Sequence, residues 1–223
     1  MPEPQDPAPP SDAAARIGRS IVLVGLMGAG KTSIGRLLAE RLGLPFVDSD
    51  AEIERAGGAA IDEIFVLEGE ATFRSGERRV IARLLSGPPA VIATGGGAYL
   101  DPTTRATVRE RAVSVWLKAN LDTLVKRTSR RGGRPLLKRG DPRKILASLI
   151  DERYPVYGEA DLTVETGEES PEIVVKRVLA ALEAHLGAGP LVAPAARRDA
   201  GTRGHPRHRR TRRRRPGGVR HDG

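Results

Sequence analysis

Hydrophobic residues follow two alternating patterns between residues 20 and 186. Short, mostly apolar runs have the length of buried strands, and they lie at 21–24, 45–48, 90–93, 113–117 and 161–164. Between these runs, apolar positions recur at helical spacing, as over 34–42 and 61–86. Strands that alternate with helices predict an α/β fold in which helices cover both faces of a parallel sheet.

Local signals refine this pattern at three places. Asn120 is expected to cap a helix that starts near Leu121, and Ser170 to cap a last helix with Pro171 in its first turn. The apolar positions expected on that last helix are Ile173, Val174, Val178, Leu182 and Leu186. Residues 129–142 are rich in Gly, Pro and Arg and are too long for a simple connection, so we predict a lid there.

The two ends of the chain differ in composition from the body at 20–186. Five prolines among the first ten residues predict a disordered N-terminal arm over 1–19. Residues 187–223 hold eleven Arg, no Lys and two acidic residues, and we predict a disordered tail there. This tail carries the whole net charge of +9, so residues 1–186 are neutral. The basic charge of the chain therefore says nothing about what the body binds.

Composition excludes several classes of protein. The chain has no cysteine, which excludes disulfides, thiol catalysis, and zinc or iron–sulfur sites with Cys ligands. Neither a signal peptide nor a run of about 20 apolar residues is present. We therefore expect a cytoplasmic protein without a membrane partner.

Residues 25–32, GLMGAGKT, match the phosphate-binding pattern G-x-x-x-x-G-K-[ST]. A predicted strand precedes the motif and a helix follows it, so main-chain N–H groups and the helix N-terminus can bind phosphate. We expect Lys31 to contact the β- and γ-phosphates and Thr32 to ligate Mg²⁺. The ATP-binding residues expected here are Gly28, Ala29, Gly30, Lys31, Thr32 and Ser33.

Two absences narrow the class of nucleotide-binding enzyme. No N-K-x-D motif for guanine is present, which argues against a GTPase. The third predicted strand ends in Ala93-Thr94-Gly95 and lacks the acidic residue that usually ends this strand in mechanical ATPases. These features favour a kinase that acts on a small molecule or a nucleotide.

Asp48 and Asp50 follow the second predicted strand, where a parallel sheet borders its ligand crevice. In an extended segment the two carboxylates share a face, so that one could support a metal and the other accept the proton of a hydroxyl group. The alternative is that Asp48 or Ser49 only caps the next helix. Likewise, the three glycines at 95–97 would let a ligand approach the main chain, or they form a flexible turn.

Three arginines stand out as candidates for binding carboxylate or phosphate. Arg74 has Glu77 one helical turn away to orient it, Arg134 lies in the predicted lid, and Arg153 ends a helical segment. The alternative for any single arginine is a solvated helix face. We assign that role to Arg78, Arg79 and Arg83.

In combination these features resemble the shikimate kinase family across residues 20–186. The matching stretches are 21–50, Phe73-Arg74 with Glu77, the glycine triplet, Arg-Pro-Leu-Leu at 134–137, and Arg153-Tyr154 followed by Ala160-Asp161. The resemblance implies a P-loop NTPase-type three-layer α/β/α sandwich with a lid and a five-stranded parallel sheet in the order 2-3-1-4-5. It also implies ATP-dependent phosphorylation of the 3-hydroxyl of shikimate, a step toward chorismate and the aromatic amino acids.

The same resemblance implies roles for the residues that meet the acceptor. Asp50 would hold the shikimate hydroxyls and act as the base, while Arg74 and Arg153 would clamp the carboxylate. Main-chain N–H groups of Gly95, Gly96 and Gly97, especially Gly96, would bind the substrate.

On the nucleotide side, the resemblance implies that Asp48 supports Mg²⁺ through water. Lys31 and Arg134 would neutralise charge on the phosphates, and Arg127 would pack beside the adenine. The partners would be shikimate and ATP, and a monomer would suffice because one chain holds the lid and both sites.

Two alternatives remain open. One is a P-loop kinase for another small polyol acid such as gluconate, although Phe73-Arg74 with Glu77 and the second arginine, Arg153, argue against it. The other is a nucleic-acid-associated ATPase recruited by the basic tail at 187–223. That tail has no aromatic residue on which single-stranded bases could stack, so we do not expect a nucleic-acid partner.

Overall fold

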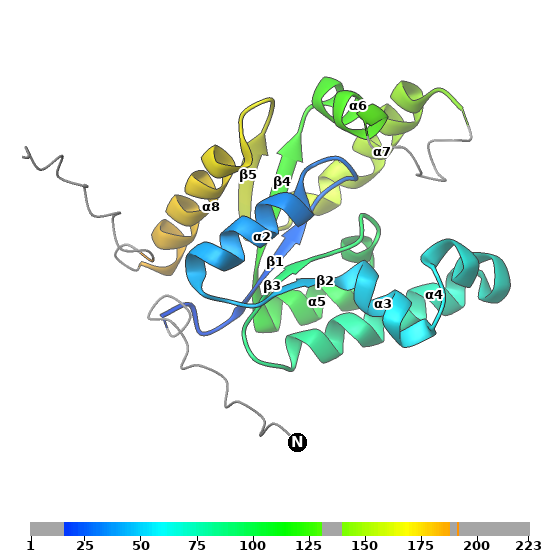
Figure 1. The fold of residues 1–223 in the computed structure, drawn as a ribbon, viewed down its shortest axis with the longest axis horizontal. Coiled ribbons are helices and arrows are strands. Elements are labelled where there is room, and N and C mark those ends of the chain that lie inside the picture. Colours follow the sequence, from blue (N-terminus) through cyan, green and yellow to red (C-terminus); the bar gives the residue numbers. More distant parts are fainter. Residues whose placement is uncertain (1–15, 131–139, 188–190, 192–223) are drawn as a thin grey trace, which may run out of the picture. The chain divides into compact units, whose positions relative to one another are not determined.

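A computed structural model describes residues 16–130, 140–187 and 191 (Figure 1). Most of the predicted lid, Arg134 included, lies outside the described residues, as do most of the predicted arm and tail. The described strands are β1 (Ser20–Val24), β2 (Phe46–Asp48), β3 (Val91–Ala93), β4 (Ala112–Ala119) and β5 (Leu162–Thr166). They form one parallel sheet in the order β2-β3-β1-β4-β5, which confirms the fold class and strand order that the resemblance implies.

Strand β1 lies at the centre of the sheet because it is apolar on both faces. Ile21 pairs with Val91 of β3 on one side and with Val113 of β4 on the other. Every residue of β1 is buried, as the unbroken apolar run predicts. The chain leaves this central strand directly into the glycine-rich motif, so the motif lies at the carboxyl edge of the sheet.

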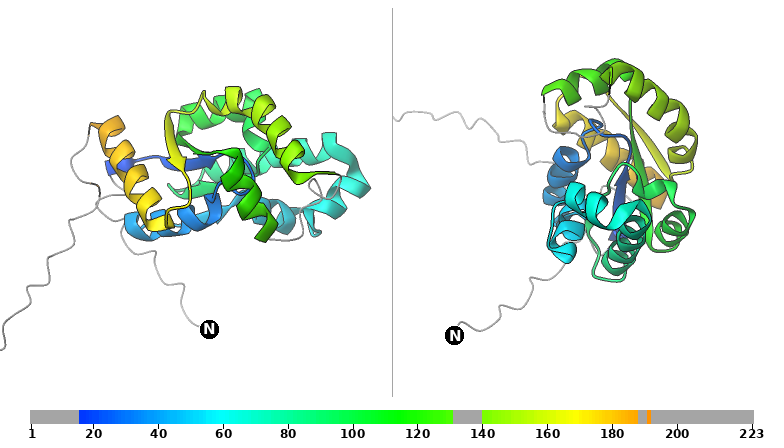
Figure 2. Two further views of the ribbon diagram at one scale, coloured as in Figure 1. Left: turned by 90° about the horizontal axis from the view of Figure 1, so that it is seen from above. Right: turned by 90° about the vertical axis from the view of Figure 1, so that its right-hand side faces the viewer.

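Helices cover both faces of the sheet, with α2 and α8 on one side and α5 and α7 on the other (Figures 1 and 2). The helices are α2 (Lys31–Leu42), α3 (Ser49–Gly57), α4 (Ile61–Leu85), α5 (Pro102–Arg111), α6 (Leu121–Arg130), α7 (Pro142–Tyr157) and α8 (Pro171–Leu186), with a short 3-10 helix η1 (Ala98–Leu100). Ser129 and Arg130 belong to α6 and Pro142 to α7, so the predicted lid is bounded too widely at both ends. No helix of the described part of the chain is long and apolar enough to cross a membrane.

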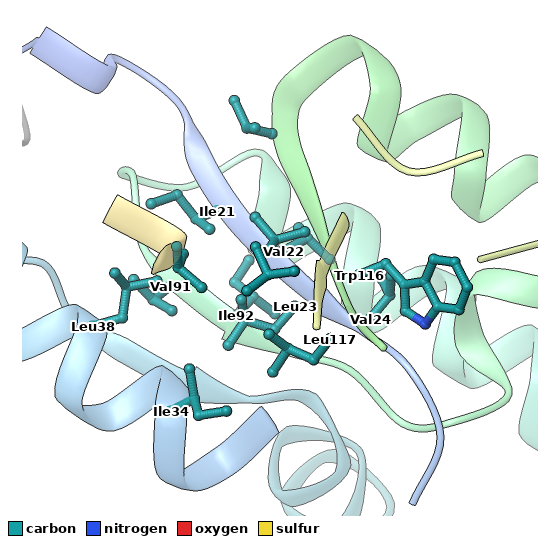
Figure 3. Packing of buried hydrophobic residues seen from close by; sticks show 14 of the residues in the cluster. Ile21, Val22, Leu23, Val24, Ile34, Leu38, Val91, Ile92, Trp116 and Leu117 are labelled. Carbon is teal, nitrogen blue, oxygen red and sulfur yellow. The ribbon is translucent and has the colours of Figure 1, made fainter. Parts of the chain in front are cut away.

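The main core lies on both faces of the sheet, where side chains of α2, α5, α7 and α8 pack against the strands. Figure 3 shows the part of it that includes α2 and Trp116 of β4. Ile34 and Leu38 of α2 point toward the strands, as the helical spacing predicts. Ile17 and Leu191 belong to this core and are each 4% exposed. The packed part of the chain therefore extends beyond the expected limits of 20 and 186, because an apolar side chain at each end is buried.

The capping predictions have different outcomes at α6 and α8. Asn120 accepts a hydrogen bond from the Thr123 N–H at 2.9 Å, which confirms it as the cap of α6. Ser170 stands at the cap position of α8 but makes no capping hydrogen bond with its side chain. Ile173 is 45% exposed, because it lies off the stripe that faces the sheet. The buried residues of α8 are Val174, Val175, Val178, Leu179 and Leu182.

Two glycines shape the elements next to the site. A Cβ atom on Gly35 of α2 would lie 2.6 Å from the Phe46 ring of β2, so only glycine lets this helix approach the strand so closely. Gly69 interrupts α4 with φ 79° and ψ 166°, values that are not helical. The single helical stretch predicted over 61–86 is therefore two helical pieces joined at a bend.

Candidate active site

The predicted site residues that the structure describes converge on one cleft of about 760 Å³ at the carboxyl edge of the sheet. Its walls come from the loop after β1, the turn after β2, the turn after β3, and helices α4, α6 and α7. The predicted residues that line it are Gly28, Gly30, Lys31, Thr32, Ser33, Asp48, Asp50, Arg74, Gly95, Gly96, Gly97, Arg127 and Arg153. Ala29 does not line the cleft, since its side chain is buried and its N–H donates to the Leu26 carbonyl at 3.1 Å.

The phosphate-binding loop is folded as its sequence requires. Gly28 and Gly30 have φ values of 86° and 101°, which strongly favour glycine and help turn the main chain around an anion. The Lys31 ammonium donates to the carbonyls of Gly25 and Leu26 at 2.7 and 3.1 Å. The cation thus lies across the mouth of the loop, beside the N-terminus of α2, where both favour phosphate.

Asp48 both caps a helix and belongs to the site. One of its oxygens accepts from the Asp50 N–H at 3.2 Å, and the other accepts from the Thr32 hydroxyl at 3.2 Å. The segment is not extended as predicted, because α3 begins at Ser49 and Asp50 lies in its first turn. Both carboxylates nevertheless face the cleft.

Asp50 is placed where a carboxylate holds its proton more tightly than usual. The pKa of Asp50 is raised to about 6, because burial and then the nearby Asp48 carboxylate outweigh the opposing effect of the Lys31 ammonium. A group with this pKa changes protonation state close to neutral pH, which suits a general base.

Two glycines of the triplet after β3, Gly95 and Gly97, are required by the close approach of other site residues. A Cβ atom on Gly95 would lie 2.5 Å from an Asp50 oxygen, and one on Gly97 would lie 2.6 Å from the Arg74 guanidinium. The Gly95 N–H donates to the Ser49 hydroxyl at 3.2 Å, which ties the triplet to the start of α3. Side chains here would displace the groups that form the acceptor end of the cleft.

Arg74 is held in place by a buried carboxylate, as its spacing from Glu77 predicts. Its Nη1 donates to Glu77 at 2.7 Å, and Glu77 is only 3% exposed. Burial raises the pKa of Glu77, and the pairing with Arg74 opposes that rise. The guanidinium also lies 5.9 and 5.2 Å from the ring centres of Phe65 and Phe73, so aromatic faces support it from the side.

Arg153 reaches the same end of the cleft from α7. Its Nη1 donates to the Gly96 carbonyl at 3.3 Å, and its side chain is mostly buried. Arg74 of α4 and Arg153 of α7 therefore both lie beside the glycine triplet. A carboxylate between them would meet two guanidinium groups.

Arg127 of α6 lies at the other end of the cleft, against the phosphate-binding loop. Its Nη1 donates to the carbonyls of Gly28 and Ala29 at 3.3 and 3.1 Å, and its Nη2 donates to the Gly167 carbonyl. The planar guanidinium thus joins the loop after β1 to the loop after β5. It forms part of the cleft wall beside these two loops.

Several residues that line the cleft are not among the predicted site residues. Ile61 and Phe65 line the acceptor end, while Glu168, Glu169, Pro171 and Val174 line the nucleotide end. Pro171 and Val174 were predicted only as parts of a helix, because only the tertiary packing of α8 against α2 brings them to the cleft. Phe65 carries a weak signal, since it lies two helical turns before the Phe73-Arg74 pair.

Comparison with known proteins connects this geometry to a family. A family model described as shikimate kinase matches residues 27–183. The chain belongs to the shikimate kinase family. A shikimate kinase from Paramagnetospirillum magneticum is 60% identical over 173 residues, which cover 78% of this chain and 89% of that relative. One from Caulobacter vibrioides is 54% identical over 175 residues, covering 78% and 88%.

Solved structures support the same assignment. The shikimate kinase from Acinetobacter baumannii in complex with shikimate superposes with a TM-score of 0.73 at 40% identity, covering 77% of this chain and 97% of that one. A gluconokinase from Sinorhizobium meliloti superposes with a TM-score of 0.56 at 22% identity, covering 77% and 98%. The second similarity extends to the fold alone, so it gives no support to gluconate as the acceptor.

Proposed function

We propose that this kinase transfers the γ-phosphoryl group of ATP to the 3-hydroxyl of shikimate, giving shikimate 3-phosphate and ADP. The reaction is a step in the biosynthesis of chorismate and the aromatic amino acids. The observation that carries the proposal is a single cleft in which a phosphate-binding loop faces Asp50 and two flanking arginines. Shikimate has one carboxylate and several hydroxyls, and these groups match the arginines and the aspartate in charge and hydrogen bonding.

At the acceptor end, Asp50 accepts hydrogen bonds from the shikimate hydroxyls and takes the proton of the 3-hydroxyl. The deprotonated oxygen forms a bond to the γ-phosphorus while the bond from that phosphorus to the ADP oxygen breaks. A pKa of about 6 leaves Asp50 ionised at neutral pH and basic enough to take part in the transfer.

Arg74 and Arg153 bind the carboxylate of shikimate and thereby orient the ring. The hydrogen bond to Glu77 already holds the Arg74 side chain in place, so this side chain loses less conformational freedom when the substrate binds. Main-chain N–H groups of Gly95, Gly96 and Gly97 border the same space and can donate to the substrate, although that of Gly95 must first leave the Ser49 hydroxyl. Positioning of this kind is the main contribution a protein makes to phosphoryl transfer.

At the nucleotide end, we propose that the loop residues Gly28–Ser33 bind the phosphates and that Arg127 packs beside the adenine. Ala29 can contribute only its main chain, because its side chain is buried. Lys31 neutralises phosphate charge by leaving the carbonyls it now contacts. Arg134, outside the described residues, keeps the phosphate-neutralising role expected from its sequence.

We also propose Mg²⁺ as the cofactor, held by Thr32 directly and by Asp48 through water. The two side chains bring oxygen atoms within 3.2 Å of each other, and oxygen is the ligand that Mg²⁺ prefers. Over residues 16–130, 140–187 and 191, no three His, Cys, Asp or Glu side chains group into a metal cage. That fits an ion that keeps several waters and phosphate oxygens, and that would neutralise charge on the phosphates when bound.

One chain supplies every described wall of the cleft, so we propose that the monomer is the active form. We also propose a cytoplasmic location, and no nucleic-acid partner for the folded body. Sedimentation of the enzyme at working concentration tests the first of these points, since an obligate dimer would contradict it.

The test of function measures ADP release from MgATP by the full chain, with shikimate, gluconate or polynucleotide added separately. We expect turnover that depends on shikimate alone and a product whose phosphorus NMR spectrum identifies the 3-phosphate. Turnover that ignores shikimate would overturn the choice of acceptor while leaving the nucleotide site intact. Stimulation by polynucleotide would instead favour a nucleic-acid-associated ATPase.

A further inference from the structure

Tyr157 forms a buried link between two parts of the acceptor site. It lies one helical turn after Arg153 on α7, so both side chains project from the same helix face. The Tyr157 hydroxyl donates to the Gly96 carbonyl. Arg153 donates to the same carbonyl at 3.3 Å, so Tyr157 and Arg153 share one acceptor.

We propose that Tyr157 is a positioning residue that fixes the Arg153 guanidinium and the glycine triplet in the arrangement that binds the acceptor's carboxylate. Tyr157 is fully buried and is not among the residues that line the cleft, so it acts through its two neighbours. The inference rests on the function proposed above for Arg153 and the triplet.

Peptide geometry explains how a contact on one side of the triplet controls the other side. The Gly96 carbonyl and the Gly97 N–H belong to one planar peptide and point in opposite directions. Holding the carbonyl on the α7 side therefore sets the direction of the N–H. Glycine has no side chain to restrict its backbone, so this peptide would otherwise rotate more easily than most.

Arg153 depends on the same carbonyl. Among the described residues, its Nε has no hydrogen-bond partner, although the Glu152 carboxylate lies 3.6 Å away. The hydrogen bond to the Gly96 carbonyl, which Tyr157 also holds, is thus the contact that orients the guanidinium. Burial raises the pKa of Tyr157 to about 12, so the hydroxyl keeps its proton and donates at every pH at which the enzyme would work.

The chain provides a matched control in Tyr154. This residue lies on the same helix, packs against the same Trp116, and donates its hydroxyl to the Ala119 carbonyl at the end of β4. Neither Tyr154 nor Ala119 lines the cleft. A change to phenylalanine at either position removes one buried hydroxyl and one hydrogen bond to a main-chain carbonyl, but only one of them touches the site.

The experiment compares Tyr157→Phe with Tyr154→Phe in the full chain by steady-state kinetics and thermal unfolding. We expect Tyr157→Phe to raise the KM for shikimate about tenfold, with kcat and the KM for ATP changed less than about twofold. Tyr154→Phe should leave all three constants within about twofold of their wild-type values. It should lower the melting temperature about as much as Tyr157→Phe does. Equal effects of the two substitutions on the KM for shikimate would overturn the proposal.

A double variant separates a positioning role from a general one. In an Arg153→Ala background, Tyr157→Phe should raise the KM for shikimate by clearly less than it does in the wild type, because its main target is gone. Fully multiplicative effects would overturn the link to Arg153. If the wild-type chain itself fails to phosphorylate shikimate, the proposed function falls and this inference falls with it. An active wild type with two equivalent tyrosine variants defeats the inference alone.

Discussion

The two ends of the cleft are built in different ways. The phosphate end is one contiguous segment, residues 25–33, which comprises the loop after β1 and the start of α2. The acceptor end is assembled from Asp50, Arg74, the triplet at 95–97 and Arg153, which lie on separate elements. The first is shaped mainly by its local backbone conformation, to which Arg127 of α6 adds two hydrogen bonds. The second depends on how α3, α4 and α7 pack on the sheet. Substitutions at the acceptor end should therefore weaken the binding or turnover of shikimate and leave ATP binding intact.

The largest expected effect is at Asp50. Asp50→Asn keeps the size of the side chain but removes the base, so kcat should fall about 10³-fold. The dissociation constant for ATP should stay within about twofold, because none of the nucleotide-binding loop is changed. Asp62→Asn, at an exposed position in the first turn of α4, is the control. Stopped-flow or coupled-assay turnover near the wild-type rate in Asp50→Asn would remove this residue from the chemistry.

The next effect concerns the two arginines. Arg74→Ala and Arg153→Ala should each raise the KM for shikimate about 100-fold, since each loses a charged hydrogen bond to the carboxylate. The KM for ATP should change less than about twofold. Arg78→Ala is a matched control, because Arg78 lies one turn after Arg74 and pairs with Asp101 away from the cleft. Near-normal shikimate affinity in both variants would exclude the carboxylate clamp.

The pH dependence reports the environment of Asp50 in the free enzyme. With a pKa of about 6, kcat/KM for shikimate should fall about tenfold for each pH unit below that value. An acid limb near pH 4 would show instead that Asp50 is solvated like an ordinary carboxylate.

The same carboxyl group should affect stability in the opposite direction, because the free energy of unfolding should fall as the pH rises. The folded pKa lies above the ordinary value of 3.8, so the folded protein binds this proton more tightly than the unfolded chain does. The stabilisation is complete below about pH 4 and is lost as the pH rises through about 6, with a total of about 3 kcal/mol. Urea unfolding across this range should show the decline, and Asp50→Asn should abolish it.

The smallest expected effect is from removing the basic tail. Deletion of 194–223 retains Leu191, which is buried against α8, so the folded body should stay intact. We expect kcat and both KM values to change less than about twofold, because the described cleft includes none of these residues. A loss of polynucleotide-stimulated ATP turnover on deletion would show that the tail recruits a second activity.

Sequence reasoning succeeded where the signal is local. The apolar run of β1 and the glycine-rich motif predict a buried strand followed by a turn that borders a ligand cleft, and both are present, while phosphate binding there stays a prediction. The strand order came from the resemblance and not from any pattern, because pairing between distant strands leaves no short-range signal. The backbone at Asp50 was predicted as extended and is helical, since capping by Asp48 starts α3 at once.

Contacts between distant segments account for what the sequence did not predict. Tyr157 meets Gly96 across 61 positions of sequence, and Pro171 reaches the cleft only through the packing of α8. Glu77 was predicted as a partner of Arg74 because helical spacing brings them together, and its deep burial became evident only in the structure. The acceptor end was thus recognisable as a set of residue types, while its geometry was not.

The close contact between Gly35 and Phe46 also affects two residues of the proposed Mg²⁺ site, Thr32 and Asp48. Thr32 lies one helical turn before Gly35 on α2, and Asp48 lies two residues after Phe46 on β2. Gly35 thus sets the distance between the Thr32 hydroxyl and the Asp48 carboxylate. A methyl group at position 35 would push α2 outward by some fraction of an ångström, and the gap between the oxygens would widen with it. Selectivity for a small divalent ion would then depend on a hydrophobic contact that never touches the ion.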